Sequence, residues 1–227
     1  MSNPPSSSTF IGRILDRLER LPGVKGRASQ AIFLAAYFML ASSMYLVVLN
    51  VRGHDKQFVT NTAWDDAMPF YPSWTWIYLV PYVIGPIVAI ALRRRAFEWY
   101  IRAATIVLVI TLIIFIVFPT QTLRPPRPAD DNLTGWLYNT MVDMDDPPAN
   151  AAPSLHVSLS CLLAWAIIFD LPRWTWAAAL GAILVWLSTL LTKQHHLIDV
   201  GTGAALATII ALWRRRHLDS EPVYSSQ

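Results

Sequence analysis

Four polar residues that could do chemistry stand between two apolar stretches near the C-terminal end of the chain. Residues 188–201 read S-T-L-L-T-K-Q-H-H-L-I-D-V-G, so Lys193, His195, His196 and Asp199 follow closely on one another. His195 and Asp199 are four residues apart, which favours one face of a helix beginning in this turn. A carboxylate there can keep one imidazole nitrogen protonated and direct the other outward, as in a nucleophilic or proton-transferring histidine. The simpler interpretation is an interfacial histidine at an acidic helix start.

A second histidine begins another apolar stretch, at the end of a proline-rich connection. Ser154 and His156 lie there in the segment A-P-S-L-H. Ser154 is a residue type that caps helices, and a helix N-terminus offers free N–H groups and a positive dipole end to an anion. His156 would face such an anion, although a histidine at a helix start is more often a structural residue.

Two arginines precede this histidine in the same connection, residues 119–152. They lie in the segment T-Q-T-L-R-P-P-R-P. A guanidinium grips phosphate through two parallel hydrogen bonds, so Arg127, and with less weight Arg124, are candidate phosphate ligands. The alternative is that these arginines pair with Asp130 and Asp131.

The elements that must position these residues are apolar enough to cross a membrane. Of the 227 residues, 54% are hydrophobic and only 15% are charged. Five segments without a charged residue, and a sixth that carries only His156, approach the roughly 20 residues that cross a bilayer. They are residues 31–50, 74–92, 103–123, 155–169, 174–192 and 200–213. The sequence therefore predicts an all-α integral membrane protein, a bundle of six transmembrane helices in one domain over residues 31–213.

The flanking segments have a different character. Residues 1–30 combine a Ser- and Pro-rich, disordered start with a 3.6-residue apolar pattern over 10–21. That pattern, with its basic face, predicts a helix on the inner membrane surface, or else one packed on the bundle. Residues 214–227 are predicted to be a basic cytoplasmic tail. The single cysteine, Cys161, excludes a disulfide within the chain and a cysteine-based metal site.

Basic residues divide unequally between the two ends of the predicted bundle. With a cytoplasmic N-terminus, 13 of the 18 Lys and Arg fall in inner segments and five in outer ones. The positive-inside rule therefore predicts cytoplasmic termini in the plasma or inner membrane. The net charge of +3 is on this interpretation a topology signal, and no nucleic-acid partner is expected. Counting the crossings brings the arginines, Ser154 and His156, and the 193–199 turn to the same, extracytoplasmic face.

Together these groups suggest phosphoryl transfer through a phosphohistidine. His195, oriented by Asp199, would attack the phosphorus. His156 would protonate the leaving alkoxide and then activate water or an acceptor alcohol. The groups that would neutralise the phosphoryl oxygens are Arg127 or Arg124, Lys193 and the backbone at Ser154. Since side chains supply the positive charge, no metal or other cofactor is expected.

The motifs P-S-L-H (153–156) and S-T-x5-H-x3-D (188–199), with an upstream R-P, resemble those of the type 2 phosphatidic acid phosphatase (PAP2) superfamily. The resemblance covers roughly residues 75–213. The local forms look closest to the branch with inositol phosphorylceramide synthase and related bacterial membrane phosphatases. The resemblance implies a six-helix bundle with an extracytoplasmic site, no required metal, and the roles just given to His195, Asp199 and His156.

The chain departs from that pattern at its cationic positions. The lysine expected seven residues before the R-P arginine is absent, since position 120 is Thr and position 117 is Val. Leu155 replaces a glycine, and Thr189 replaces a second phosphate-binding arginine. Lys193 is expected to replace one lost cation. A site with fewer cations should bind a phosphomonoester dianion less strongly, so a phosphodiester or diphosphate lipid is also a candidate substrate.

The predicted function is hydrolysis of a phosphorylated lipid headgroup at the extracytoplasmic membrane surface. The partners expected are a lipid phosphate or diphosphate and the bilayer, whereas the sequence predicts neither the lipid nor the oligomeric state. Three alternatives remain. They are transfer of the phospho-headgroup to an acceptor lipid alcohol, as in sphingolipid synthesis, a non-catalytic lipid binder, and a metal hydrolase with His156, His195 and Asp199 as ligands.

Overall fold

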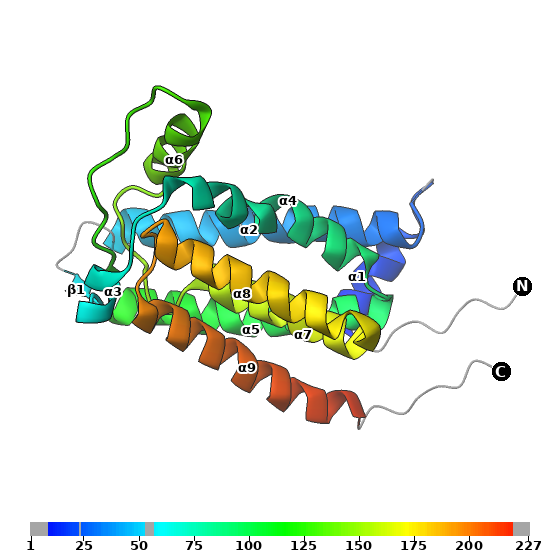
Figure 1. Ribbon diagram of the computed structural model, residues 1–227. Coiled ribbons are helices and arrows are strands. Elements are labelled where there is room, and N and C mark those ends of the chain that lie inside the picture. Colours follow the sequence, from blue (N-terminus) through cyan, green and yellow to red (C-terminus); the bar gives the residue numbers. More distant parts are fainter. Residues whose placement is uncertain (1–8, 23, 53–56, 220–227) are drawn as a thin grey trace, which may run out of the picture.

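The protein is a bundle of roughly aligned helices (Figure 1). The computed structural model describes residues 9–22, 24–52 and 57–219, with side chains to residue 215. The principal helices are α2 (Arg27–Arg52), α4 (Thr75–Ala91), α5 (Arg94–Val117), α7 (Leu155–Asp170), α8 (Thr175–Leu191) and α9 (Leu197–Asp219).

Five helices in the described ranges are long and apolar enough to cross a membrane. They are Arg27–Arg52, Pro72–Ala91, Arg94–Val117, Pro172–Leu191 and Leu197–Arg215. The remaining helix of the bundle, α7, is apolar but has only 16 residues. It packs against α4, α5, α8 and α9, so protein surrounds it on several sides. The predicted all-α membrane bundle is confirmed, with five long helices and one shorter inner one.

Apolar side chains of different sizes fill the space between the inner helices. Phe97 and Val107 on α5, Leu162 and Ala166 on α7, and Ala207 on α9 are fully buried in one cluster. In a bilayer, helix association depends on this kind of packing, because lipid tails are as apolar as the side chains.

The segments flanking the bundle begin and end differently from the prediction. The N-terminal helix α1 (Phe10–Leu18) is shorter than the predicted 10–21, and it buries Ile11 and Leu15 against the bundle. At the other terminus α9 continues to Asp219, so the first part of the predicted basic tail is helical. Residues 1–8 and 220–227, where the disordered start and the rest of the tail were predicted, lie outside the described residues.

Short elements cover one end of the bundle. They are α3 (Ala63–Ala67), the 3-10 turn η1 (Pro72–Trp74), α6 (Leu133–Met144), and the parallel strands β1 (Phe58–Val59) and β2 (Thr120–Gln121). The strands pair Phe58 with Thr120, which joins the segment after α2 to the segment after α5. A second 3-10 turn, η2 (Pro172–Trp174), connects α7 to α8. The short elements lie where α7 and α9 begin, whereas α1 lies at the other end (Figure 1).

Candidate active site

The turn between α8 and α9 carries the first candidate histidine. The carbonyl oxygen of Thr189 accepts the N–H groups of both Gln194 (3.0 Å) and His195 (3.1 Å), which closes the turn. Lys193 takes a positive φ of 55° there. His195 therefore precedes α9 instead of lying on it, and the bend of the turn directs its ring back toward the first turn of the helix.

Asp199 is the carboxylate that faces this histidine. Nδ1 of His195 lies 3.6 Å from Oδ2 of Asp199, whose side chain is fully buried. The same Oδ2 accepts the N–H of His196 at 2.8 Å, so Asp199 also caps the helix start. Such contacts often tighten only when substrate is bound. The arrangement fits a histidine whose orientation and positive charge are supported by a buried acid.

The start of α7 is tied directly to the start of α9. The N–H of Ser154 donates to the carbonyl of Asp199 (3.0 Å), and its hydroxyl accepts the N–H of Val157 as a helix cap. Ser158 Oγ donates to the carbonyls of Ser154 (2.8 Å) and Gly203 (3.0 Å). The Ser154 hydroxyl thus serves as a structural cap, and what it offers an anion is the surrounding backbone.

His156 is held by two tyrosines of α4. Its Nε2 lies 3.1 Å from the Tyr78 carbonyl, its Nδ1 lies 3.4 Å from Tyr82 Oη, and its ring stacks on that of Tyr78 with centroids 4.2 Å apart. A carbonyl only accepts, so Nε2 carries the proton and Nδ1 accepts from Tyr82. The hydrogen bond between Ser154 and Asp199 holds the starts of α7 and α9 together, so His156 and His195 lie at the same end of the bundle.

Arg124 reaches this site through an acidic residue. Its Nη2 donates to Asp145 Oδ2 (2.7 Å) and its Nη1 to the Asp145 carbonyl (3.0 Å), and the arginine side chain is only 10% exposed. Tyr45 donates its hydroxyl to Oδ1 of Asp145 (2.7 Å). Burial raises the pKa of Asp145, while Arg124, Tyr45 and His195 act in the opposite direction. Because His195 acts on the pKa of Asp145, the pair of Arg124 and Asp145 lies in the vicinity of His195.

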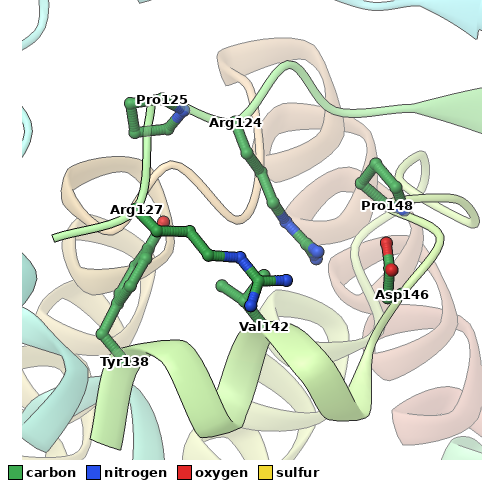
Figure 2. A pocket seen from close by; sticks show the side chains of 7 residues that line it. All are labelled: Arg124, Pro125, Arg127, Tyr138, Val142, Asp146 and Pro148. Atoms are coloured by element: carbon green, nitrogen blue, oxygen red, sulfur yellow. The ribbon is translucent and has the colours of Figure 1, made fainter. Parts of the chain in front are cut away.

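Arg127 lies farther out. Its Nη1 pairs with Asp143 Oδ1 at 2.5 Å, and about half of its side chain is exposed. The described ion pairs of both arginines are therefore with acids at the end of α6, and neither pairs with Asp130 or Asp131. Both guanidinium groups extend into a cavity of about 190 Å³ beside the α6 residue Val142 (Figure 2). The geometry favours Arg124, the less exposed of the two, as the ligand nearer the histidines.

Lys193 and Asp65 join the α8–α9 turn to the loop before α4. Lys193 Nζ donates to the main-chain carbonyl of Asp65. The buried Asp65 carboxylate accepts the N–H of Leu197 (2.7 Å) at the start of α9, and also the N–H and hydroxyl of Thr62. Sequence reasoning missed Asp65. The T-x-x-D pattern of a capping box was a local signal for it, but the contact with Leu197 is not local.

His196 is a buried connector next to the candidate nucleophile. Its Nε2 accepts the N–H of Leu123 (3.4 Å), and its Nδ1 donates to Thr60 Oγ1 (2.9 Å). Burial lowers the pKa of His196, which favours this neutral form. Because Leu123 precedes Arg124, His196 fixes the path of the segment that carries the arginine.

Two further motif positions are occupied by local contacts. Ser188 Oγ donates to the Val185 carbonyl (2.6 Å), and Thr189 Oγ1 donates to that of Trp186 (2.7 Å). Neither hydroxyl is directed at an anion in this conformation. Within the part of the chain that the structure describes, no group of three or more His, Cys, Asp or Glu side chains could hold a metal ion.

Comparison with known proteins gives one match. The family model of the PAP2 superfamily matches residues 47–213, which include every candidate site residue. None of the curated proteins and none of the solved structures matches the chain significantly.

Proposed function

Because the chain belongs to the PAP2 superfamily, we propose that it hydrolyses the phosphorylated headgroup of a membrane lipid through a phosphohistidine. Membership supports a phosphatase-type, lipid-related function. The observation that carries the finer proposal is the pairing of His195 with the buried Asp199, next to His156 and Arg124 at one end of the bundle.

In the first step, His195 attacks the phosphorus and the bond to the leaving oxygen breaks. With Nδ1 facing Asp199, Nε2 is the nitrogen available for attack. The carboxylate stabilises the positive charge that develops on the ring. Arg124 and the backbone N–H groups at the start of α7 balance the charge on the phosphoryl oxygens.

His156 handles the proton. Its Nε2 donates a hydrogen bond to the Tyr78 carbonyl. Nδ1, which lies beside Tyr82, is therefore the nitrogen that gives and takes the proton in the reaction. Nδ1 in its protonated state gives the proton to the leaving alkoxide, and then takes one from the water that hydrolyses the phosphohistidine. Arg127 lines the outer cavity and contributes to headgroup binding, and Lys193 supports the turn that carries His195.

The test is turnover by purified protein in lipid nanodiscs. Phosphatidic acid, phosphatidylglycerol phosphate, a polyprenyl diphosphate and the phosphodiester phosphatidylglycerol are supplied in turn, and every phosphate-containing product is measured. His195→Ala should lose turnover by about 10³-fold or more, together with the acid-labile phosphoenzyme signal of a phosphohistidine. Asp131→Asn, an exposed change in the 119–152 connection, serves as the matched control and should keep both.

The same assay separates the alternatives. A new phospholipid formed with an added lipid alcohol indicates a transferase. Full loss of turnover on strong chelation indicates a metal hydrolase, whereas inhibition by vanadate supports phosphoryl chemistry. Lipid binding that survives His195→Ala, with no product from any lipid, indicates a non-catalytic binder and rejects the proposal.

We also propose that the site faces the extracytoplasmic side of the plasma or inner membrane, with both termini cytoplasmic. The unequal distribution of basic residues supports this orientation. The catalytic domain proposed is residues 31–213, preceded by helix α1, which packs on the bundle, and followed by the basic end of α9.

A further inference from the structure

Two acids at the end of α6 already occupy the two arginines of the site. Asp143 and Asp145 are two residues apart, and they pair with Arg127 and Arg124 at 2.5 and 2.7 Å. Each pair brings one positive and one negative charge to the region in which a phosphate would bind. The two acids therefore reduce the net positive charge that the arginines bring there.

Asp145 is held firmly in this position. Its two carboxylate oxygens are bonded to Tyr45 and Arg124, and its carbonyl accepts a second hydrogen bond from the same guanidinium. The last residue of α6 is Met144, so the carboxylate is fixed by the end of a helix as well as by its partners. A lipid phosphate that displaced this carboxylate would have to break its hydrogen bonds to both Arg124 and Tyr45.

Arg124 also lines the cavity of about 190 Å³ while it stays bonded to Asp145. Nine-tenths of its side chain is buried, yet its Nε has no hydrogen-bond partner among the described residues. A guanidinium can bind two anions along different edges, because its five N–H groups point in fixed directions. A phosphate that binds Arg124 from this cavity would then lie beside the Asp145 carboxylate.

This juxtaposition distinguishes phosphate esters by their charge. A phosphomonoester carries close to two negative charges at neutral pH, whereas a phosphodiester carries one. A like charge close by, in surroundings of reduced dielectric constant, is costly. The ammonium group of Lys193 keeps its charge but is held in place by a hydrogen bond to the Asp65 carbonyl.

We infer that Asp145 is a specificity-determining residue that makes the site favour lipid phosphodiesters over lipid phosphomonoesters. This inference rests on the proposed function and names its substrate class. His195 Nε2 forms a bond to the phosphorus, the bond to one alcohol breaks, and that alkoxide takes a proton from His156. The other alcohol remains esterified to the phosphorus. Water then gives its proton to His156 and breaks the N–P bond, releasing a phosphomonoester.

The test compares two pairs of substrates on the full-length protein in nanodiscs. One pair is p-nitrophenyl phosphate and bis(p-nitrophenyl) phosphate, which share a leaving group, and the other is dioleoyl phosphatidic acid and dioleoyl phosphatidylglycerol. Asp145→Asn should raise kcat/KM for the monoester relative to the diester by about tenfold. Asp145→Glu, which keeps the charge, should leave the ratio near that of the wild type.

Asp143→Asn is the matched control, because it removes the same charge from the exposed arginine pair. Screening by solvent should limit its effect on the ratio to about twofold or less. An Asp145→Asn ratio equal to the Asp143→Asn ratio overturns the inference. If Asp145→Asn does not fold, Asp145→Ser is measured. If neither folds, competition between the two lipids in mixed nanodiscs decides, and preference of the wild type for phosphatidic acid overturns the inference.

The inference and the proposed function fail in different ways. Turnover that depends on His195 but shows no change of ratio in Asp145→Asn rejects only the specificity role. A folded protein that forms no phosphoenzyme with any of the four substrates rejects the proposed function itself.

Discussion

At the residue scale, the two histidines next to each other in the chain have different surroundings. His195 faces Asp199 at the edge of the site with 12% of its side chain exposed, whereas His196 is buried and bonded through both ring nitrogens. Only the first has a ring nitrogen to offer a substrate. The second joins the Thr60 loop to the segment of Arg124, and its neutral state is part of that connection.

The buried His196 should make stability depend on pH. Burial lowers the pKa of His196 from the ordinary value of 6.5, and the positive charges of His195 and Lys193 lower it further. The carboxylates of Asp199 and Asp65 act in the opposite direction and raise it, but by less. The unfolded chain then binds more protons than the folded one below about pH 6.5, so the stability this group contributes is present above that pH and is lost as pH falls from there through the lower pKa of the folded state. We expect the midpoint of thermal unfolding in detergent to drop between pH 7.5 and 5.5, and the drop to be smaller in His196→Gln. An identical drop in the variant contradicts this account.

At the element scale, the site depends on how closely the starts of α7 and α9 approach. Ser154 bonds to the Asp199 carbonyl, and Gly203 lies against Ser154 one turn farther along α9. A Cβ added at Gly203 would lie 2.6 Å from the Ser154 carbonyl oxygen and 3.2 Å from Ser158 Oγ. The contact is with backbone, so the helices would have to separate.

Gly203→Ala should therefore move His156 away from His195. We expect turnover to fall by about tenfold or more, and the free energy of unfolding to decrease by about 1–3 kcal/mol. Gly201→Ala, two residues earlier with open space at its Cβ, is the control and should keep turnover. Thermal unfolding and lipid turnover measured on both variants check the prediction. Equal effects at the two positions would show that turnover does not depend on the close approach of α7 and α9 at Gly203.

At the scale of the whole molecule, one end of the bundle holds the site and the other holds α1 and its ion pairs. Arg94 binds both Asp16 of α1 and Glu98 of its own helix, and Arg93 binds Asp170 at the end of α7. Charged contacts of this kind belong to an interfacial region, where water and headgroups are available. The ends therefore differ in chemistry as well as in sequence.

The orientation can be measured with single cysteines. Cys161 is buried, so Cys161→Ser gives a background for labelling by a membrane-impermeant maleimide. In that background Leu133→Cys on α6 should be labelled in intact cells, whereas Leu21→Cys after α1 should be labelled only after the membrane is opened. Both positions are exposed and uncharged, so the basic-residue distribution is unchanged. The reverse pattern would turn the site toward the cytoplasm.

The amino-acid sequence by itself determined the helical bundle and the motif histidines. Apolar runs near the length of a bilayer span have few alternatives in a membrane, since backbone groups there must bond within the helix. Counting the spans then brings the arginine, P-S-L-H and 193–199 segments to one face. Local patterns were sufficient for these conclusions.

Only the tertiary structure decided what surrounds those histidines. It paired Arg124 with Asp145 instead of the nearer Asp131, set Tyr78 and Tyr82 on His156, and brought Asp65 to Leu197. Such contacts join segments whose separation in sequence says nothing of their distance in space. They depend on how helices pack and on the path of the long connections over the end of the bundle, which no helical period encodes.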